Sequence, residues 1–148
     1  MAQTNPDTYG YRMAVAQAGQ KYDIRPDVVM SFAAEEVINP GQPLMRGTDP
    51  EKQVLVSDAS GFVGIALFTQ AMENTLSAGT APYQPTTTVS VLTQGAAYVE
   101  SAVDTVVAGE TAYVTATGTF TNVEGTNLAI GQFLTSGDTG DLVVLKIL

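Results

Sequence analysis

Short apolar runs, separated by glycine, proline and small polar residues, recur from residue 28 to residue 148. Runs of this length with turn residues between them are typical of strands rather than helices. The pattern predicts eleven strands, at residues 28–33, 43–46, 53–56, 62–68, 87–92, 96–100, 105–107, 111–117, 127–130, 132–135 and 141–148. Many short strands at such spacing favour an all-β fold, either a small β-barrel or a β-sandwich.

The pattern also predicts which strands are covered. In residues 111–117, threonines alternate with Ala112 and Val114, which predicts a strand that is exposed on one face. Residues 142–145 are apolar at every position, so this strand should be central and covered on both faces. One segment is ambiguous, because apolar residues at helical spacing from Phe68 to Leu76 also fit a short helix after the 62–68 strand.

The prolines divide the chain into two halves. All seven lie at or before Pro85. Because proline cannot donate a hydrogen bond to a strand ladder, we expect the first half to be irregular with edge strands and the second half to be a continuous set of strands.

The first 27 residues show no sustained period of 2 or 3.6, and so have no obvious face to bury. We predict an extended N-terminal arm at residues 1–27, ahead of a body at residues 28–148. Its three tyrosines, Met13 and Ile24 favour an arm that becomes ordered on a neighbouring subunit. Removing residues 1–27 should leave a folded body. The partner-binding candidates are the aromatic, basic and methionine residues of the arm: Tyr9, Tyr11, Arg12, Met13, Lys21, Tyr22 and Arg25.

Composition supports the all-β class and narrows the partners. Val, Thr and Ile, which favour strands, make up 41 of 148 residues. The formal net charge is −9 and no run of Lys and Arg occurs, so nucleic acid is not expected as a partner. No apolar stretch reaches the roughly 18 residues of a membrane span, so no membrane is expected either. Residues 1–52 carry five of the six basic residues, and Arg12, Lys21 and Arg25 could pair with the acidic body of another copy.

The chain contains no Cys and no His, which excludes disulfides, thiolate nucleophiles and histidine-based triads. Glu35 and Glu36 are adjacent, so on an extended strand they point to opposite faces and cannot converge on one bond. Asp138 and Asp141 lie in a Gly-Asp-Thr-Gly-Asp loop that fits turn chemistry better than a calcium loop. We therefore expect no catalytic residue, no metal and no cofactor.

Several segments resemble the cement, or head-decoration, proteins of tailed bacteriophages. They are EEVINPGQPLMRGTD at residues 35–49, FVGIAL at 62–67, VSVLTQG at 89–95, GQFLTS at 131–136 and LVVLK at 142–146. The resemblance implies a small β-body that clamps major capsid protein subunits from the outside, without catalysis. It further implies a capsid partner with an HK97-like fold, self-association as a trimer or another symmetric cluster, a place on the outer surface of the virion, and synthesis in the host cytoplasm.

Two other functions stay open from the sequence. The first is a carbohydrate- or calcium-binding β-sandwich module on a virion or cell surface, for which Tyr83, Tyr98 and Tyr113 could serve as sugar platforms, although the chain has no Trp. The second is a hydrolase that uses only carboxylates, which would require two convergent acids that the sequence does not place.

Overall fold

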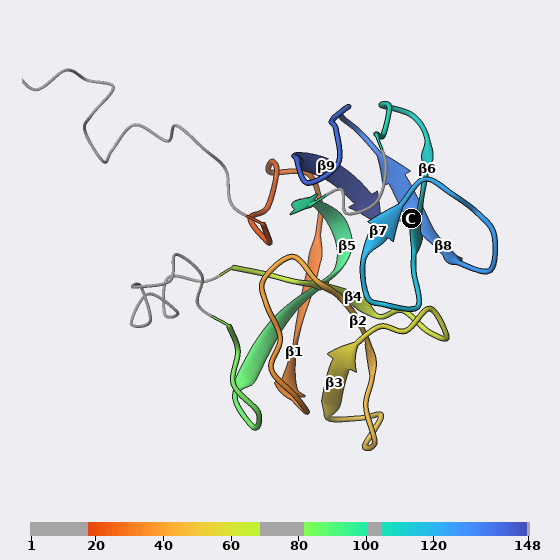
Figure 1. The fold of residues 1–148 in the computed structure, drawn as a ribbon. Helices are drawn as coiled ribbons and strands as arrows, with labels where there is room; N and C mark the ends of the chain where they lie inside the picture. Colours follow the sequence, from red (N-terminus) through yellow and green to blue (C-terminus); the bar gives the residue numbers. More distant parts are fainter. Residues whose placement is uncertain (1–17, 69–81, 101–104, 148) are drawn as a thin grey trace, which may run out of the picture.

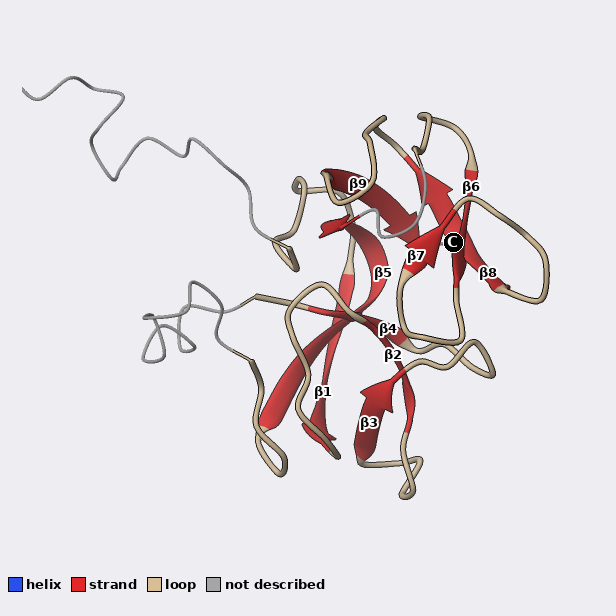
Figure 2. Cartoon of the chain, viewed as in Figure 1, coloured by secondary structure: helices blue, strands red, loops and turns tan. Residues whose placement is uncertain are grey.

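The computed structural model describes residues 18–68, 82–100 and 105–147. Figure 2 shows strands and loops in these ranges, without a helix. The strands are β1 (Val28–Ala34), β2 (Pro43–Arg46), β3 (Gln53–Val56), β4 (Gly64–Ala66), β5 (Thr88–Glu100), β6 (Thr111–Val114), β7 (Phe120–Thr121), β8 (Leu128–Phe133) and β9 (Leu142–Ile147). The predicted all-β class is confirmed.

Five strands close into a barrel in the order β1-β3-β2-β4-β5, because β1 pairs with β3 on one side and with β5 on the other. The β1–β3 pairing is parallel, and the other pairings in the barrel are antiparallel. Closure removes most free sheet edges, which isolated sheets leave open. The prediction that the proline-rich half holds only irregular structure and edge strands is therefore wrong: four of the five barrel strands come from it, and Pro43 stands at the first position of β2, where its missing N–H is tolerated.

The long strand β5 belongs to two sheets (Figure 1). Its first part pairs with β1 and β4 in the barrel, and from Gly95 onward it pairs with β9. A second sheet continues from there in the order β5-β9-β8-β6-β7. Gly95 has φ +129°, and a Cβ atom there would lie 2.8 Å from the Cβ of Asp27. Glycine therefore lets the strand change sheets without ending.

The molecule has two hydrophobic cores. One fills the barrel and includes Phe32 and Val91, and the other lies under the second sheet and includes Leu92 and Phe133. Consecutive residues of a strand point to opposite faces, so Val91 and Leu92 on β5 serve different cores. The wall where β4 meets Val91 and Leu92 of β5 is therefore buried on both faces, which explains why all three residues of β4 are buried without alternation.

Several strand predictions are confirmed. The bounds of β2 and β3 are as predicted, and β9 lies centrally between β5 and β8. Other predictions are wrong. Gly95 and Gly131 were expected to end strands but lie inside β5 and β8, residues 105–107 form only an isolated bridge from Val106 to Gly137, and β7 was missed. The possible helix after Phe68 falls on residues 69–81, outside the described ranges.

Candidate partner-binding surface

Residues 18–22, at the described end of the predicted arm, pair with β5 of their own chain. The Gly19 N–H donates to the Tyr98 carbonyl at 2.8 Å, the Tyr98 N–H donates to the Gln20 carbonyl at 2.9 Å, and the Tyr22 N–H donates to the Ala96 carbonyl at 3.0 Å. Gly19 has φ +85°, and a Cβ atom there would meet three backbone atoms at 2.8 Å. This end of the arm is therefore fixed to the body by backbone hydrogen bonds in a space that only glycine fits.

Two basic residues of this segment form ion pairs with nearby acidic residues of the same chain. The Lys21 ammonium lies 3.1 Å from an Asp27 carboxylate oxygen, and the Arg25 guanidinium lies 2.8 Å from that of Asp23. The Arg25 hydrogen bonds lower the pKa of Asp23, and the Asp23 carboxylate raises the pKa of Arg25 in return. Both pairs are exposed to solvent, so they contribute little stability. Their main effect is to leave this segment electrically neutral.

Tyr22 forms the aromatic part of the surface. Its ring packs edge-on against Tyr98, with centroids 5.7 Å apart and an angle of 70° between the planes, and the Arg25 guanidinium lies 6.0 Å from its centroid. Such edge-to-face contact is a preferred aromatic geometry. The contact orients the ring while 42% of the residue stays exposed.

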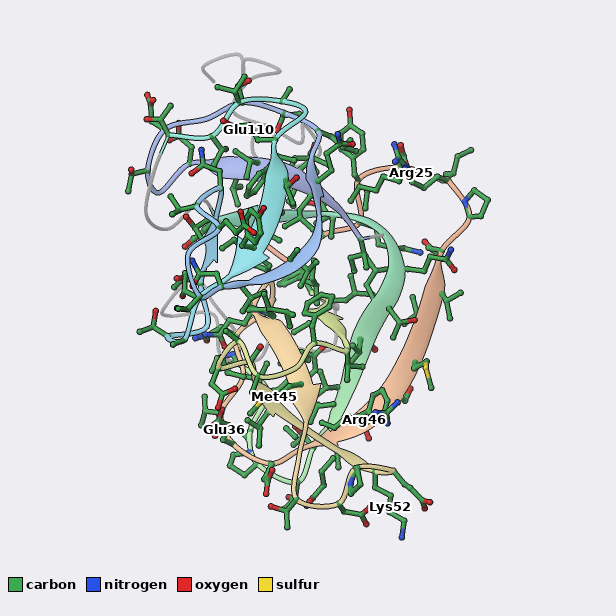
Figure 3. All side chains as sticks on the ribbon, turned by 90° about the vertical axis from the view of Figure 1, so that its right-hand side faces the viewer. Arg25, Glu36, Met45, Arg46, Lys52 and Glu110 are labelled. Carbon is green, nitrogen blue, oxygen red and sulfur yellow. The ribbon has the colours of Figure 1, made fainter. Side chains whose placement is uncertain are left out.

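Exposed apolar side chains gather between residues 22 and 30, which we call the 22–30 surface. Of the large apolar residues exposed in the described ranges, most lie here: Tyr22, Ile24, Val28, Val29 and Met30. Ile24 is 102% exposed, so nothing in the described chain covers it. Figure 3 shows Arg25 on the loop that leads into β1, and β1 at the outer margin of the molecule beside β5. Exposed apolar residues concentrated on one segment, here on the loop and both faces of the β1 strand, are a feature of protein-binding surfaces.

Three of the seven predicted binding residues, Lys21, Tyr22 and Arg25, lie together on this surface. The other four, from Tyr9 to Met13, lie outside the described residues. Sequence reasoning counted Ile24 among the apolar residues of the arm without naming it as a binding residue, and it missed residues 28–30. The apolar run 28–30 was interpreted as an ordinary core strand, although three successive apolar residues cannot all face one core, and that excess was the available signal.

The adjacent glutamates support the fold separately. Glu35 accepts hydrogen bonds from the Thr48 N–H, at 3.1 Å, and from the Thr48 hydroxyl. Glu36 accepts one from the Val56 N–H at 3.0 Å. The two carboxylates thus bind different neighbours, as their adjacency predicts, and do not converge on a common point.

The two aspartates of the last predicted loop form a turn. The Asp138 N–H donates to the Asp141 carboxylate at 3.0 Å, and the Asp141 N–H donates to the Asp138 carbonyl at 2.9 Å. The Thr105 hydroxyl donates to the Asp138 carboxylate at 3.3 Å. The acids therefore brace the β8–β9 connection, and within the described ranges no three metal-ligating side chains come together.

The tyrosines proposed as sugar platforms are not equivalent. Tyr83 is only 6% exposed and its hydroxyl donates to the Leu67 carbonyl at 2.6 Å. The suggestion that Tyr83 offers a ring to a sugar is therefore wrong, because its ring belongs to the barrel core. Tyr98 is half-buried against Tyr22, and Tyr113 is half-buried on β6.

In the part of the chain that is described, no helix is long and apolar enough to cross a membrane.

The fold is that of a small all-β protein with two cores, in which most of the exposed large apolar residues of the described ranges lie between residues 22 and 30. The model of a family described as structural cement protein (E217 gp24/Pam3 gp6) matches residues 6–148, and the chain belongs to this family. The resemblance noted in the sequence is confirmed, and the family is one of structural proteins of phage capsids.

Solved structures show the same fold at low sequence identity. A chain in the capsid of Myoviridae phage XM1 is 18% identical, with a TM-score of 0.67, and the match covers 93% of this chain and 97% of that one. The N base of head fiber gp8.5 of bacteriophage phi29 is 13% identical, with a TM-score of 0.50, over 83% of this chain and 95% of that one. Among curated proteins, no sequence matches the chain.

Proposed function

We propose that this protein binds the outer surface of a tailed-phage head and stabilises contacts between major capsid protein subunits that have an HK97-like fold. The observation that carries the proposal is the match of the structural cement family across residues 6–148. In this proposal the protein is made in the host cytoplasm, acts in the virion as a trimer or another symmetric cluster, and uses no cofactor and no catalysis.

The binding surface in this proposal combines the arm with the 22–30 surface. The residues that contact the partner are Tyr9, Tyr11, Arg12 and Met13 on the arm, and Lys21, Tyr22 and Arg25 beside β1. Tyr22 supports this role because its ring is exposed yet oriented by Tyr98. Binding through several linked copies at once raises the overall affinity without new contacts, so a symmetric cluster can hold a shell firmly.

The local ion pairs favour an apolar rather than an electrostatic contact. Lys21 and Arg25 are already paired with Asp27 and Asp23, so pairing with the acidic body of another copy would require these contacts to exchange. Exposed ion pairs are weak, so exchange is feasible, but it yields little net energy. Binding to heads should therefore change little between low and moderate salt.

The test is co-sedimentation of the purified chain with undecorated heads of its own phage, before and after expansion. Saturable binding that raises the melting temperature of the heads is the expected result. Tyr22→Ser should weaken binding, and Val123→Ser, at an exposed apolar position in the loop between β7 and β8, is the matched control. Absence of binding to both head forms would overturn the proposal.

A further inference from the structure

The first half of β1 has a strand neighbour on one side only. Positions 28 to 33 pair with β5, whereas the pairing with β3 includes only Ala33 and Ala34. The barrel is therefore closed at one end of β1 and open at the other. In the described part of the chain, no strand pairs with the open side of residues 28–31.

The hydrogen bonds at the paired end of β1 show in which direction its backbone N–H and C=O groups point. The Ala34 N–H donates to the Thr87 carbonyl at 2.9 Å, on the β5 side, and the Ala33 N–H donates to the Lys52 carbonyl at 2.7 Å, on the β3 side. Alternate residues of a strand direct their N–H and C=O groups to the same side. Val29 and Ser31 therefore share the direction of Ala33 and present their backbone groups to the open side.

This edge lacks the features that usually prevent strand addition. Exposed edges are commonly protected by lysine, proline or inward-facing charge. Here Val28, Val29 and Met30 are 45%, 43% and 44% exposed and carry no charge. The two basic residues that precede this edge, Lys21 and Arg25, are paired with Asp27 and Asp23. An extended, uncharged, partly apolar segment would meet both hydrogen-bonding groups and apolar side chains.

We propose that residues 9–15 from the arm of a second copy add to this edge as an extra strand. The inference rests on the proposed function and names the surface that receives the arm. In residues 9–15, Tyr9, Tyr11, Met13 and Val15 stand at alternate positions, and Arg12 is the only charged residue. Although the first 27 residues as a whole have no sustained period, these seven residues alternate as a strand with one apolar face does. Backbone hydrogen bonds would supply affinity, and the alternate side chains would supply register.

The attachment of the arm favours another copy over the same chain. Gly19 is held at Tyr98 and Phe68, on the β4 side of β5, whereas the open edge of β1 lies on the other side of β5. A strand added to that edge would lie three strand spacings, about 14 Å, from β4. The four residue steps from Val15 to Gly19 span at most about 14 Å. In contrast, the 17 residues before Ala18 can extend about 55 Å, far enough to reach a neighbouring subunit.

The test uses full-length variants that each lack one half of the contact. Val29→Lys places a charge on the edge, and Tyr11→Pro removes a backbone donor from the arm segment. Val123→Lys and Thr4→Pro are matched controls outside the edge and outside residues 9–15. Self-association is measured by sedimentation velocity up to about 1 mM, the effective concentration that tethering produces. Thermal melting checks that each variant is folded, and Ser31→Pro replaces Val29→Lys if that variant is not.

We expect the unmodified protein and both controls to associate, and each of the two test variants alone to associate at least about tenfold more weakly. Mixing the two variants should restore association, because one supplies an intact arm and the other an intact edge. Three results would overturn the inference: a monomeric unmodified protein, a mixture that does not recover, or a Tyr11→Pro variant that associates normally, which would indicate edge-to-edge pairing of β1. Co-sedimentation with heads, measured separately, shows whether the proposed function survives such a result.

Discussion

At the scale of single residues, a hydroxyl group in the barrel core should contribute measurably to stability. The Tyr83 hydroxyl donates to the Leu67 carbonyl at 2.6 Å from a buried position. Removing the hydroxyl leaves the buried Leu67 carbonyl without this hydrogen bond, which costs about 1–3 kcal/mol of stability. We expect Tyr83→Phe to lower the free energy of unfolding in urea by about this amount. Tyr113→Phe, at a half-buried position, should change it less, and equal effects would contradict the assignment.

A second residue-scale prediction concerns pH. One carboxylate oxygen of Glu110 accepts hydrogen bonds from the Asn122 amide and the Val107 N–H, both at 2.8 Å, and these lower the pKa of Glu110 from its ordinary 4.5. A carboxyl whose pKa is lowered by folding stabilises the protein above the unfolded pKa and loses this effect as pH falls through the folded pKa. Glu110→Gln should therefore be less stable than the unmodified protein at pH 7.

Urea unfolding of both proteins from pH 7 to pH 3 checks this prediction. The difference in free energy should be constant at neutral pH and should shrink below about pH 4.5. Asp23 and Asp58 also have lowered pKa values, but they are present in both proteins and cancel in the comparison. A difference that does not depend on pH would show that Glu110 acts by packing alone.

At the scale of strands, the glycines show what a sequence can and cannot predict. The apolar runs located most strands, because burial of alternate residues leaves a local pattern. Gly95 and Gly131 were misinterpreted as turns, because a glycine required by a distant neighbour has the same local signal as one in a turn. Asp27 leaves no room for a Cβ atom at Gly95, and the Lys146 carbonyl leaves none at Gly131. Such contacts depend on long-range pairing, which no local pattern contains.

Gly131 therefore gives a strand-scale prediction. A Cβ atom there would lie 2.0 Å from the Lys146 carbonyl oxygen on the paired strand β9, and the next nearest atoms are also backbone atoms of Lys146 and Ile147, which have little room to move. Gly131→Ala should force β8 and β9 apart and destabilise the protein by about 1–3 kcal/mol, as overpacking does. Gly61→Ala is the control, because its nearest neighbour would be 3.8 Å away. Comparable denaturant midpoints for the two variants would contradict the argument.

At the scale of the whole molecule, the sequence predicted the all-β class and the family, but it left a barrel and a sandwich as alternatives. Closure depends on β1 pairing with two strands, and the division into two cores depends on β5 changing sheets at Gly95. The candidate surface was predicted in part for a similar reason. Tyr22 was recognisable as an aromatic residue in a leader, whereas the exposure of Val29 results from where β3 stops pairing.

The arm gives the last prediction, and the structure changes where it should be cut. Removing residues 1–27 would also remove residues 18–22, which satisfy the backbone groups of Ala96 and Tyr98 on β5. That truncation should therefore lower the melting temperature as well as weaken head binding, since unpaired backbone groups are costly. Removing residues 1–17 keeps these hydrogen bonds, so it should leave the melting temperature nearly unchanged.

Comparing the two truncations separates binding from stability. If the arm carries partner contacts, the chain without residues 1–17 should remain folded, as judged by thermal melting, and should bind heads far less than the full chain in co-sedimentation. The chain without residues 1–27 should bind no better and should melt at a lower temperature. If the shorter truncation coats heads as densely as the full chain, then the arm has no binding role, and the 22–30 surface alone must account for attachment.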